Sequence, residues 1–313
     1  MNSRDDLIKV ANYYYVQKMS QQEIADKLMV SRQKVSRMLK LAEEQNIVEI
    51  RINDYERSSA KFEDKLKQLL GLEQVYIVDT EDPILISERA IEYVERYVFC
   101  GINIGVTFGH TLSQLCKSSI RSEKRSINII QMVGGFNMST NNSSKPDVIA
   151  DCFARIMGGE SYCLYIPAII DNLYLKELIY KEEQFKPMLG MLKKIDIALL
   201  TIGSMEDHPN NVLVRDQYLR KSDLEHLRSQ GAIGDVCLHF FNRNGEIVDK
   251  EFDKRLIGYV EDVKAIKTRI GLSYGIHKVE PIIGACRGKF INHLVTNLST
   301  AREIVFKLEN NDN

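Results

Sequence analysis

Hydrophobic residues along the chain change their spacing near residue 54. Before that point they recur at helical intervals in three short segments, and after it short β-branched runs alternate with helical patterns. Alternation of this kind is typical of a mostly parallel sheet covered by helices on both faces. We therefore predict two domains: a helical domain over residues 1–54, and a doubly wound α/β domain over residues 55–313.

The first domain is predicted to hold three helices, with a very short break between the last two. The first covers about residues 5–17, the second begins at Ser20 in a capping-box pattern with Glu23, and Ser31 caps the third. Each helix has one hydrophobic stripe, so the three pack around a common core in the helix-turn-helix plan. Met29 occupies the tight turn, where Gly or Asn usually supplies a positive φ.

The outer face of the third helix is basic, with no acid before Glu43. This face has polar residues at positions i, i+1, i+4, i+5 and i+8, which form one continuous stripe: Arg32, Gln33, Ser36, Arg37 and Lys40. Arg and Gln at its N-terminal end can reach base edges, and flanking residues can hold phosphates. A solvated charged face is the alternative for an isolated basic stripe, but the position on the third helix favours DNA. The predicted DNA contacts are Ser20, Gln21, Ser31, Arg32, Gln33, Ser36, Arg37 and Lys40. Residues 47–52 alternate and predict a strand, either a wing or the anchor of a linker.

Composition narrows the class of protein. The net charge is −1, so binding to DNA must come from a local patch. The N-terminal segment lacks the apolar core of a signal peptide, and the apolar runs are too short to span a bilayer, so we expect a cytoplasmic protein that does not enter a membrane. The six cysteines lack CxxC spacing, which predicts buried thiols in a reducing compartment rather than disulfides or zinc ligands.

The second domain has eight predicted strands. They cover residues 74–79, 102–108, 127–133, 161–166, 196–203, 236–241, 268–274 and 292–298. Helical patterns at 86–99, 110–119, 147–157 and 299–308 lie between most of them. Ligands of such sheets bind beyond the carboxyl ends of the strands, so the candidate site lies in the loops that follow them.

Three of these loops carry candidate binding residues. Gly109, His110 and Thr111 open a helix, where unpaired N–H groups and a hydroxyl suit a phosphate; a tight turn with nothing bound is the alternative. Asp235 could accept hydroxyl groups of a sugar, or act as a turn residue. Lys278 lies at another helix start, where a cation opposes the helix dipole and so favours an anionic partner, although a solvated lysine remains open.

Enzyme motifs are missing from the sequence. It contains no GxxxxGK[ST], GxGxxG, HExxH or GxSxG, and its six histidines have no metal-binding spacing, so we expect no cofactor and no metal. A sugar-phosphate isomerase or deaminase is the alternative function. It would need an acid/base pair, for which Asp235 with His110 or His277 remains available. A Schiff-base enzyme would need a lysine in the pocket, and Lys278 is available, but nothing in the sequence indicates that it is desolvated or that its pKa is lowered.

The chain resembles the SorC/DeoR-type sugar-binding transcriptional regulators over essentially its full length. The order and spacing of six stretches carry the resemblance: residues 20–52, 104–112, 129–135, 231–241, 256–264 and 288–305. It implies a regulator rather than an enzyme, with an effector domain like that of sugar-phosphate isomerases and deaminases but without their catalysis. It also implies a homo-oligomer, in particular a tetramer, on operator DNA, and a phosphorylated sugar that changes the affinity for DNA.

The resemblance also implies which residues contact the effector. It assigns Asp235 to the sugar hydroxyls and Lys278 to the phosphate or a nearby hydroxyl. The full set of implied effector contacts is Gly105, Thr107, Gly109, His110, Thr111, Gly135, Asp235 and Lys278. Tyr274 and Ile276 stand where small residues are common in the family, which predicts a narrower pocket.

Overall fold

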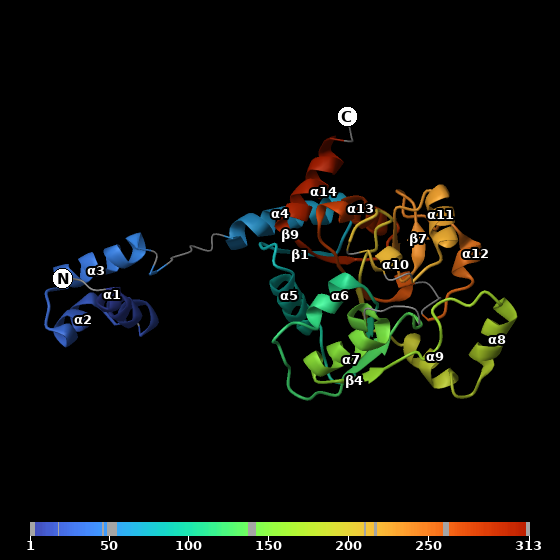
Figure 1. Cartoon of the computed structure of the whole chain (residues 1–313), viewed down its shortest axis with the longest axis horizontal. Helices are drawn as coiled ribbons and strands as arrows, with labels where there is room; N and C mark the ends of the chain where they lie inside the picture. The colour runs from blue at the N-terminus through green and yellow to red at the C-terminus, as the bar shows by residue number, and fades with distance from the viewer. Residues whose placement is uncertain are drawn as a thin grey trace. The chain divides into compact units, whose positions relative to one another are not determined.

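The chain divides into two compact units. A computed structural model describes residues 4–17, 19–45, 47–48, 55–136, 142–209, 211–215, 218–258 and 263–310 (Figure 1). The division by spatial proximity falls between residues 58 and 59, four positions beyond the boundary that the sequence suggests. Each unit has a hydrophobic core of its own.

The first unit is a trihelical bundle. Its helices are α1 (Arg4–Ala11), continued by the π-helical turn η1 (Asn12–Val16), α2 (Gln21–Leu28) and α3 (Arg32–Glu44). The predicted capping box is present, because the hydroxyl of Ser20 accepts from the Glu23 N–H at 3.2 Å and the Glu23 carboxylate accepts from the Ser20 N–H at 2.7 Å. Of the strand predicted over residues 47–52, residues 49–52 lie outside the described part, and Ile47 and Val48 form a bend.

The turn between α2 and α3 contains a left-handed residue. Met29 has φ 51° and ψ 44°, the left-handed conformation that Gly or Asn usually supplies in this turn, and its side chain is 95% exposed. The core of the unit lies on the other side of these helices and includes Ile24, Val35 and Met38. The hydrophobic stripes therefore face one another as predicted.

The second unit is built on a parallel sheet. Among the described residues, seven strands pair in the order β1-β9-β8-β5-β2-β3-β4, and every pairing is parallel. The strands are β1 (Gln74–Val78), β2 (Asn103–Val106), β3 (Asn128–Gln131), β4 (Glu160–Tyr162), β5 (Ile197–Leu200), β8 (Thr268–Leu272) and β9 (His293–Asn297). Seven of the eight predicted strands overlap these elements.

The predicted strand over residues 236–241 is wrong. Cys237 and Leu238 have φ values of 55° and 67°, so the chain reverses there. The segment instead contributes to a small antiparallel hairpin of β6 (Gly234–Val236) and β7 (His239–Phe241). A continuous apolar run gave no turn signal, because neither turn residue is Gly, Asn or Asp.

Hydrophobic cores cover both faces of the sheet. Successive strand residues point to opposite faces, so Ile197 and Leu199 of β5 join one core while Ala198 and Leu200 join the other. Figure 1 shows α5, α6 and α7 on one side and α4, α13 and α14 on the other. The helices are α4 (Tyr55–Leu70), α5 (Pro83–Glu95), α6 (His110–Leu115), α7 (Pro146–Met157), α8 (Leu173–Lys181), α9 (Lys186–Leu192), α10 (Val212–Arg215), α11 (Lys221–Ser229), α12 (Lys250–Asp253), α13 (Val279–Arg287) and α14 (Leu298–Asn310), with 3₁₀ turns η2 (Asn142–Ser144), η3 (Val263–Ala265) and η4 (Ile276–Lys278).

The strand order creates a switch point between β2 and β5. After β2 the chain proceeds outward to β3 and β4, whereas after β5 it proceeds in the opposite direction to β8 and β9. Neighbouring loops at the carboxyl ends of β2 and β5 therefore diverge and leave a crevice, which is the usual ligand position in open α/β sheets. This doubly wound arrangement confirms the predicted fold class. In the described part of the chain, none of the helices combines the length and the apolar character that a membrane span requires.

Candidate ligand pocket and nucleic-acid interface

A cavity of about 330 Å³ opens at the carboxyl ends of the strands. The loops after β2, β5 and β8 line it, together with β6, as the switch point requires. The residues of the predicted set that line this cavity are Gly109, His110, Thr111, Asp235 and Lys278. The topology thus brings together residues up to 169 positions apart in the sequence.

Three other predicted residues do not line the cavity. Gly105 lies inside β2, where a Cβ would come within 2.5 Å of the Met132 sulfur, so packing accounts for this glycine. Thr107 is fully buried, and its Oγ1 accepts a hydrogen bond from the Thr201 N–H at 3.2 Å. Gly135 pairs with Pro167, and residues 137–141, which follow it in the sequence, lie outside the described part.

The loop after β2 is held in place from two sides. Gly109 caps α6 with φ 120°, a value that favours glycine. The Thr201 hydroxyl donates to the Phe108 carbonyl at 2.8 Å, which ties this loop to the loop after β5. The Gly109 N–H donates to the Ser144 carbonyl at 3.2 Å, so this particular N–H is already paired. Contacts from this loop to a ligand therefore depend on His110 and Thr111.

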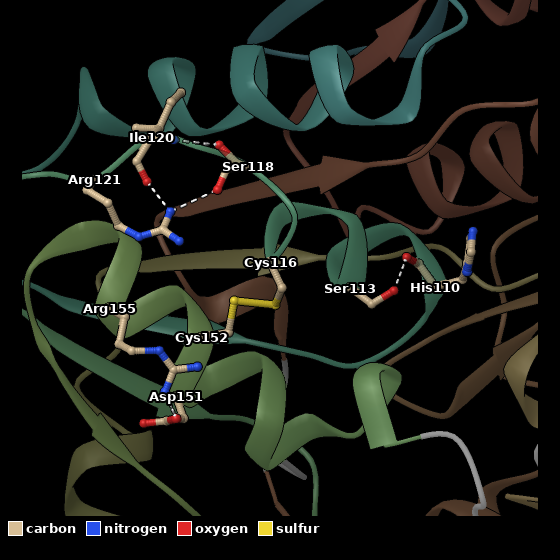
Figure 2. Close-up of a disulfide and its surroundings, with 9 residues drawn as sticks. All are labelled: His110, Ser113, Cys116, Ser118, Ile120, Arg121, Asp151, Cys152 and Arg155. Carbon is tan, nitrogen blue, oxygen red and sulfur yellow. Dashed lines mark hydrogen bonds and ion pairs between the residues drawn. A yellow bond between two sulfur atoms is a disulfide. The ribbon is translucent and has the colours of Figure 1, made fainter.

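A disulfide lies at the opposite end of α6. Figure 2 shows the bond between Cys116, which follows α6, and Cys152 of α7. The prediction of free buried thiols is therefore wrong for this pair, because the topology brings Cα atoms 36 residues apart to 5.7 Å. It is also wrong for the exposed Cys100. The remaining cysteines, Cys163, Cys237 and Cys286, are half-buried or buried, and burial raises their thiol pKa values.

Asp235 presents a buried carboxylate to the cavity. Its Oδ2 accepts from the Leu238 N–H at 3.1 Å within the β6–β7 hairpin, and its carbonyl accepts from the Gly203 N–H at 2.8 Å. Burial raises the pKa of Asp235 to about 6, although the Leu238 N–H and the positive charge of Lys278 act in the opposite direction. The carboxylate can accept hydrogen bonds from hydroxyl groups of a ligand.

Lys278 brings a cation to the same cavity. It ends η4, directly before α13, and its ammonium donates a hydrogen bond to the Ile202 carbonyl at 2.8 Å. Burial lowers the pKa of Lys278 to about 8, while the negative charges of Asp235 and Glu206 oppose this shift. The ammonium can donate three hydrogen bonds, so two remain for other partners beyond the Ile202 carbonyl.

Two histidines outside the predicted effector set stack beside Lys278. The rings of His208 and His277 lie 3.8 Å apart with an interplanar angle of 8°, and both line the cavity. Burial is the main reason why the pKa of His277 is lowered to about 4, and the neighbouring side chains of Lys278 and His208 contribute to the same shift. Nothing in the sequence signals this pair, because the two histidines are 69 residues apart and stack only where the loops after β5 and β8 meet.

The cavity has a further aromatic wall. Tyr274 lines it as predicted, and burial raises the pKa of this phenol to about 12. Ile276, by contrast, is 59% exposed and does not appear in the cavity wall. Across the described ranges, His, Cys, Asp and Glu side chains form no group of three or more that could hold a metal ion.

The first unit presents the predicted polar face of α3. Val35 and Met38 point into the core, whereas Arg32, Gln33 and Arg37 are exposed. Ser36 and Lys40 are exposed on the same helix, and the hydroxyl of Ser31 accepts from the Lys34 N–H at 3.2 Å to cap it. Ser20 caps α2, and Gln21 is the first residue of this helix. The arrangement can offer charged and amide donors to base edges and phosphates.

Comparisons with known proteins match both units. A family model described as "Putative sugar-binding domain" matches residues 55–306. The deoxyribonucleoside regulator of Bacillus subtilis (strain 168) is 30% identical over 305 residues, covering 95% of this chain and 96% of the relative. The sorbitol operon regulator of Klebsiella pneumoniae is 30% identical over 322 residues, covering 98% and 100%. The crystal structure of the full-length sorbitol operon regulator SorC from Klebsiella pneumoniae matches with a TM-score of 0.78 at 26% identity, covering 96% of this chain and 97% of that one.

Proposed function

Because the chain belongs to the SorC/DeoR-type family of sugar-binding transcriptional regulators, we propose that a phosphorylated sugar in the cavity of the second unit controls its binding to operator DNA. The chain is a transcriptional regulator with a sugar-binding domain, and its full-length relatives are regulators rather than enzymes. The prediction that it is not an enzyme is therefore confirmed.

The observation that carries the proposal is that Lys278 and Asp235 line one cavity. A phosphate needs a cation and hydrogen-bond donors, whereas neutral hydroxyl groups need acceptors such as a carboxylate. The volume of about 330 Å³ lies at the lower end of the range for small-molecule sites and suits a monosaccharide phosphate. We assign the anionic end of the ligand to Lys278, His110 and Thr111, and the sugar end to Asp235.

The DNA-binding function is assigned to α3. Arg32, Gln33 and Arg37 supply base contacts in this proposal, and Ser20, Gln21, Ser31, Ser36 and Lys40 supply the remaining contacts. We place the functional boundary of this domain at residue 54. Both ligands are encountered in the cytoplasm, where operator DNA lies.

The active assembly in this proposal is a homo-oligomer, with a tetramer as the expected state. A single trihelical module buries too little DNA surface for strong specificity, and paired half-sites multiply it. Phe62 and Leu66 of α4 pack in the core of the second unit, so these two side chains stabilise that unit and are not available for pairing between copies. Light scattering at micromolar concentration checks this, and a monomer both with and without DNA would contradict it.

A DNA-binding titration in the presence of sugars tests the proposed function. The full chain is titrated onto DNA from upstream of its own gene, with a panel of sugar phosphates and the matching unphosphorylated sugars. We expect at least one sugar phosphate to change the DNA affinity about tenfold or more, which corresponds to a coupling free energy of about 1.4 kcal/mol. The absence of an effect from every sugar phosphate in the panel would argue against the proposal, and a larger effect of the unphosphorylated sugars would refute it.

A further inference from the structure

A chain of hydrogen bonds connects two sides of the ligand cavity through buried side chains. The Gly275 N–H donates to the Thr300 hydroxyl oxygen at 2.7 Å, and that hydroxyl donates to Oδ1 of Asn297. The amide of Asn297 donates in turn to Oε2 of Glu81 at 2.6 Å. Both ends of the chain, Gly275 and Glu81, line the cavity, whereas the two groups between them have no exposed surface.

Every donor in this series of hydrogen bonds points in the same direction, toward the Glu81 carboxylate. Oδ1 of Asn297 also accepts from the Thr300 N–H at 3.2 Å, and the other end of the amide contacts a carboxylate, which needs a donor. These partners fix the orientation of the amide without ambiguity. Hydrogen bonds aligned in one direction polarise one another, and a buried member left without its partner is costly. The chain is therefore a rigid support for its two ends.

The carboxylate at the end of the chain retains hydrogen-bonding capacity. Oε2 of Glu81 accepts from Asn297, and an ionised carboxylate offers about four lone pairs over its two oxygens. Glu81 follows β1 and is an exposed residue at the cavity wall. A negative charge repels a phosphate but accepts from hydroxyl groups, so Glu81 suits the sugar end of the ligand.

The other end of the chain supports the cation of the pocket. Gly275 has φ 106° and lies directly before η4 as its N-cap, and its carbonyl accepts from the Lys278 N–H at 2.9 Å. Because the Thr300 hydroxyl holds the N–H of this same glycine, it also fixes the turn that carries Lys278. The same series of hydrogen bonds therefore supports both Glu81, at the sugar end of the pocket, and the turn that carries Lys278, at the anionic end.

We propose that Glu81 is a specificity-determining contact for ligand hydroxyl groups, and that Asn297 and Thr300 are positioning residues that hold Glu81 and the Lys278 turn at a fixed separation. The inference rests on the proposed function, in which a sugar phosphate occupies this cavity. It adds a second carboxylate, besides that of Asp235, to the sugar end.

Calorimetry on Glu81→Gln tests the contact. The probes are ribose 5-phosphate, glucose 6-phosphate and their 2-deoxy and epimeric analogues. Glutamine keeps the size and an acceptor for Asn297 but removes the charge, so we expect the affinity for the best hydroxylated probe to fall about tenfold, with a smaller loss for the probe that lacks the contacted hydroxyl. The matched control is Glu92→Gln, at an exposed carboxylate on α5 that pairs with Arg89, and it should bind as the wild type does.

The pair Thr300→Val and Thr300→Ser tests the positioning role. Valine removes the hydroxyl at nearly constant volume, and we expect about tenfold weaker binding of every sugar phosphate that binds the wild type. Serine retains the hydroxyl and should restore binding, and DNA affinity without effector should be unchanged in both variants. If Thr300→Val does not fold, Thr300→Ala takes its place as the variant that lacks the hydroxyl, and its outcomes are read in the same way.

The outcomes separate this proposal from the proposed function. Wild-type protein that binds none of the probes overturns both. Wild-type binding with an unchanged preference among hydroxyl variants in Glu81→Gln overturns the Glu81 contact alone. Equal binding by wild type and Thr300→Val, or failure of Thr300→Ser to restore binding, overturns the positioning role.

Discussion

The carboxylate of Asp235 occupies the space that a side chain at Gly203 would need. A Cβ at Gly203 would lie 1.7 Å from Oδ1 of Asp235, and the Gly203 N–H donates to the Asp235 carbonyl at 2.8 Å. The loop after β5 and the hairpin strand β6 therefore pack directly against each other. This contact is what presents a buried carboxylate to the cavity.

Replacing Gly203 with Ala should damage the sugar end of the pocket. The new methyl group must displace the Asp235 carboxylate, and overpacking of this kind costs about 1–3 kcal/mol of folding free energy. We expect weaker binding of sugar phosphates and altered preference among sugars, measured by calorimetry, together with a lower Tm.

The matched control for this substitution is Gly190→Ala. A Cβ at Gly190, within α9, would meet no atom within 4 Å, so the helix should tolerate it or gain slightly in stability. If Gly203→Ala bound the same sugars with the same affinities as Gly190→Ala, the Gly203–Asp235 contact would have no role in shaping the pocket.

Ligand affinity should fall as the pH rises through 8. Burial lowers the pKa of Lys278 to about 8, so the free protein loses this positive charge about two and a half pH units earlier than an exposed lysine does. A phosphate monoester, with a second pKa of about 6, is already dianionic there, so its own charge does not change. Calorimetry between pH 7 and 9.5 should show affinity falling toward a tenfold loss per pH unit. A flat profile up to pH 9.5 would show that Lys278 does not supply the charge.

The protonation of Asp235 should make the free energy of unfolding depend on pH. Burial raises its pKa to about 6 from an ordinary value near 3.8, so between these values the folded state holds a proton that the unfolded state releases. The contribution of this group to stability is therefore fully present below about pH 4 and is lost as the pH rises through 6. Asp235→Asn should flatten this part of a curve of unfolding free energy against pH, measured by urea denaturation. An unchanged slope in the variant would rule out this source.

Replacing Arg37 with Ala should weaken operator binding and relax its selectivity. The exposed Arg37 lies on the α3 face assigned to base contacts, and one such contact is worth about 1–3 kcal/mol. The control is Lys9→Ala, which removes one positive charge from the exposed side of α1. Fluorescence anisotropy on operator and scrambled DNA should show a selective loss only for Arg37→Ala. Equal losses on both DNAs for the two variants would indicate a charge effect rather than base recognition.

Met29→Asn should stabilise the first unit by about 0.5–1 kcal/mol. Met29 has φ 51°, a left-handed conformation that asparagine adopts more easily, and its exposed side chain contributes little to the core. Slower amide hydrogen exchange in α2 and α3 would support this expectation. Met29→Ala serves as the control, because alanine keeps the left-handed strain, and a similar gain from alanine would contradict the explanation.

The sequence predicted the helices and strands better than it predicted the contacts between distant segments. The hydrophobic period alone located the α3 core residues and seven parallel strands, because each pattern is local. It missed the chain reversal at Cys237 and Leu238, where ordinary residues adopt positive φ values, and the pairing of Cys116 with Cys152. It also missed the four-residue path from Glu81 to Gly275, since Asn297 and Thr300 carry no local signal of their partners. Such partnerships depend on strand order, which one sequence does not reveal.

The measurement that tests the central claim most directly is calorimetry of a sugar phosphate and its unphosphorylated sugar against wild-type protein and Lys278→Ala. With the ammonium of Lys278 at the cavity wall, the phosphate should contribute at least one charge-assisted hydrogen bond of about 1.5–3 kcal/mol. We expect wild-type protein to prefer the phosphorylated form by about ten- to a hundredfold, and Lys278→Ala to lose most of this preference while it binds DNA as the wild type does. Equal affinity of wild-type protein for the two forms would contradict the account.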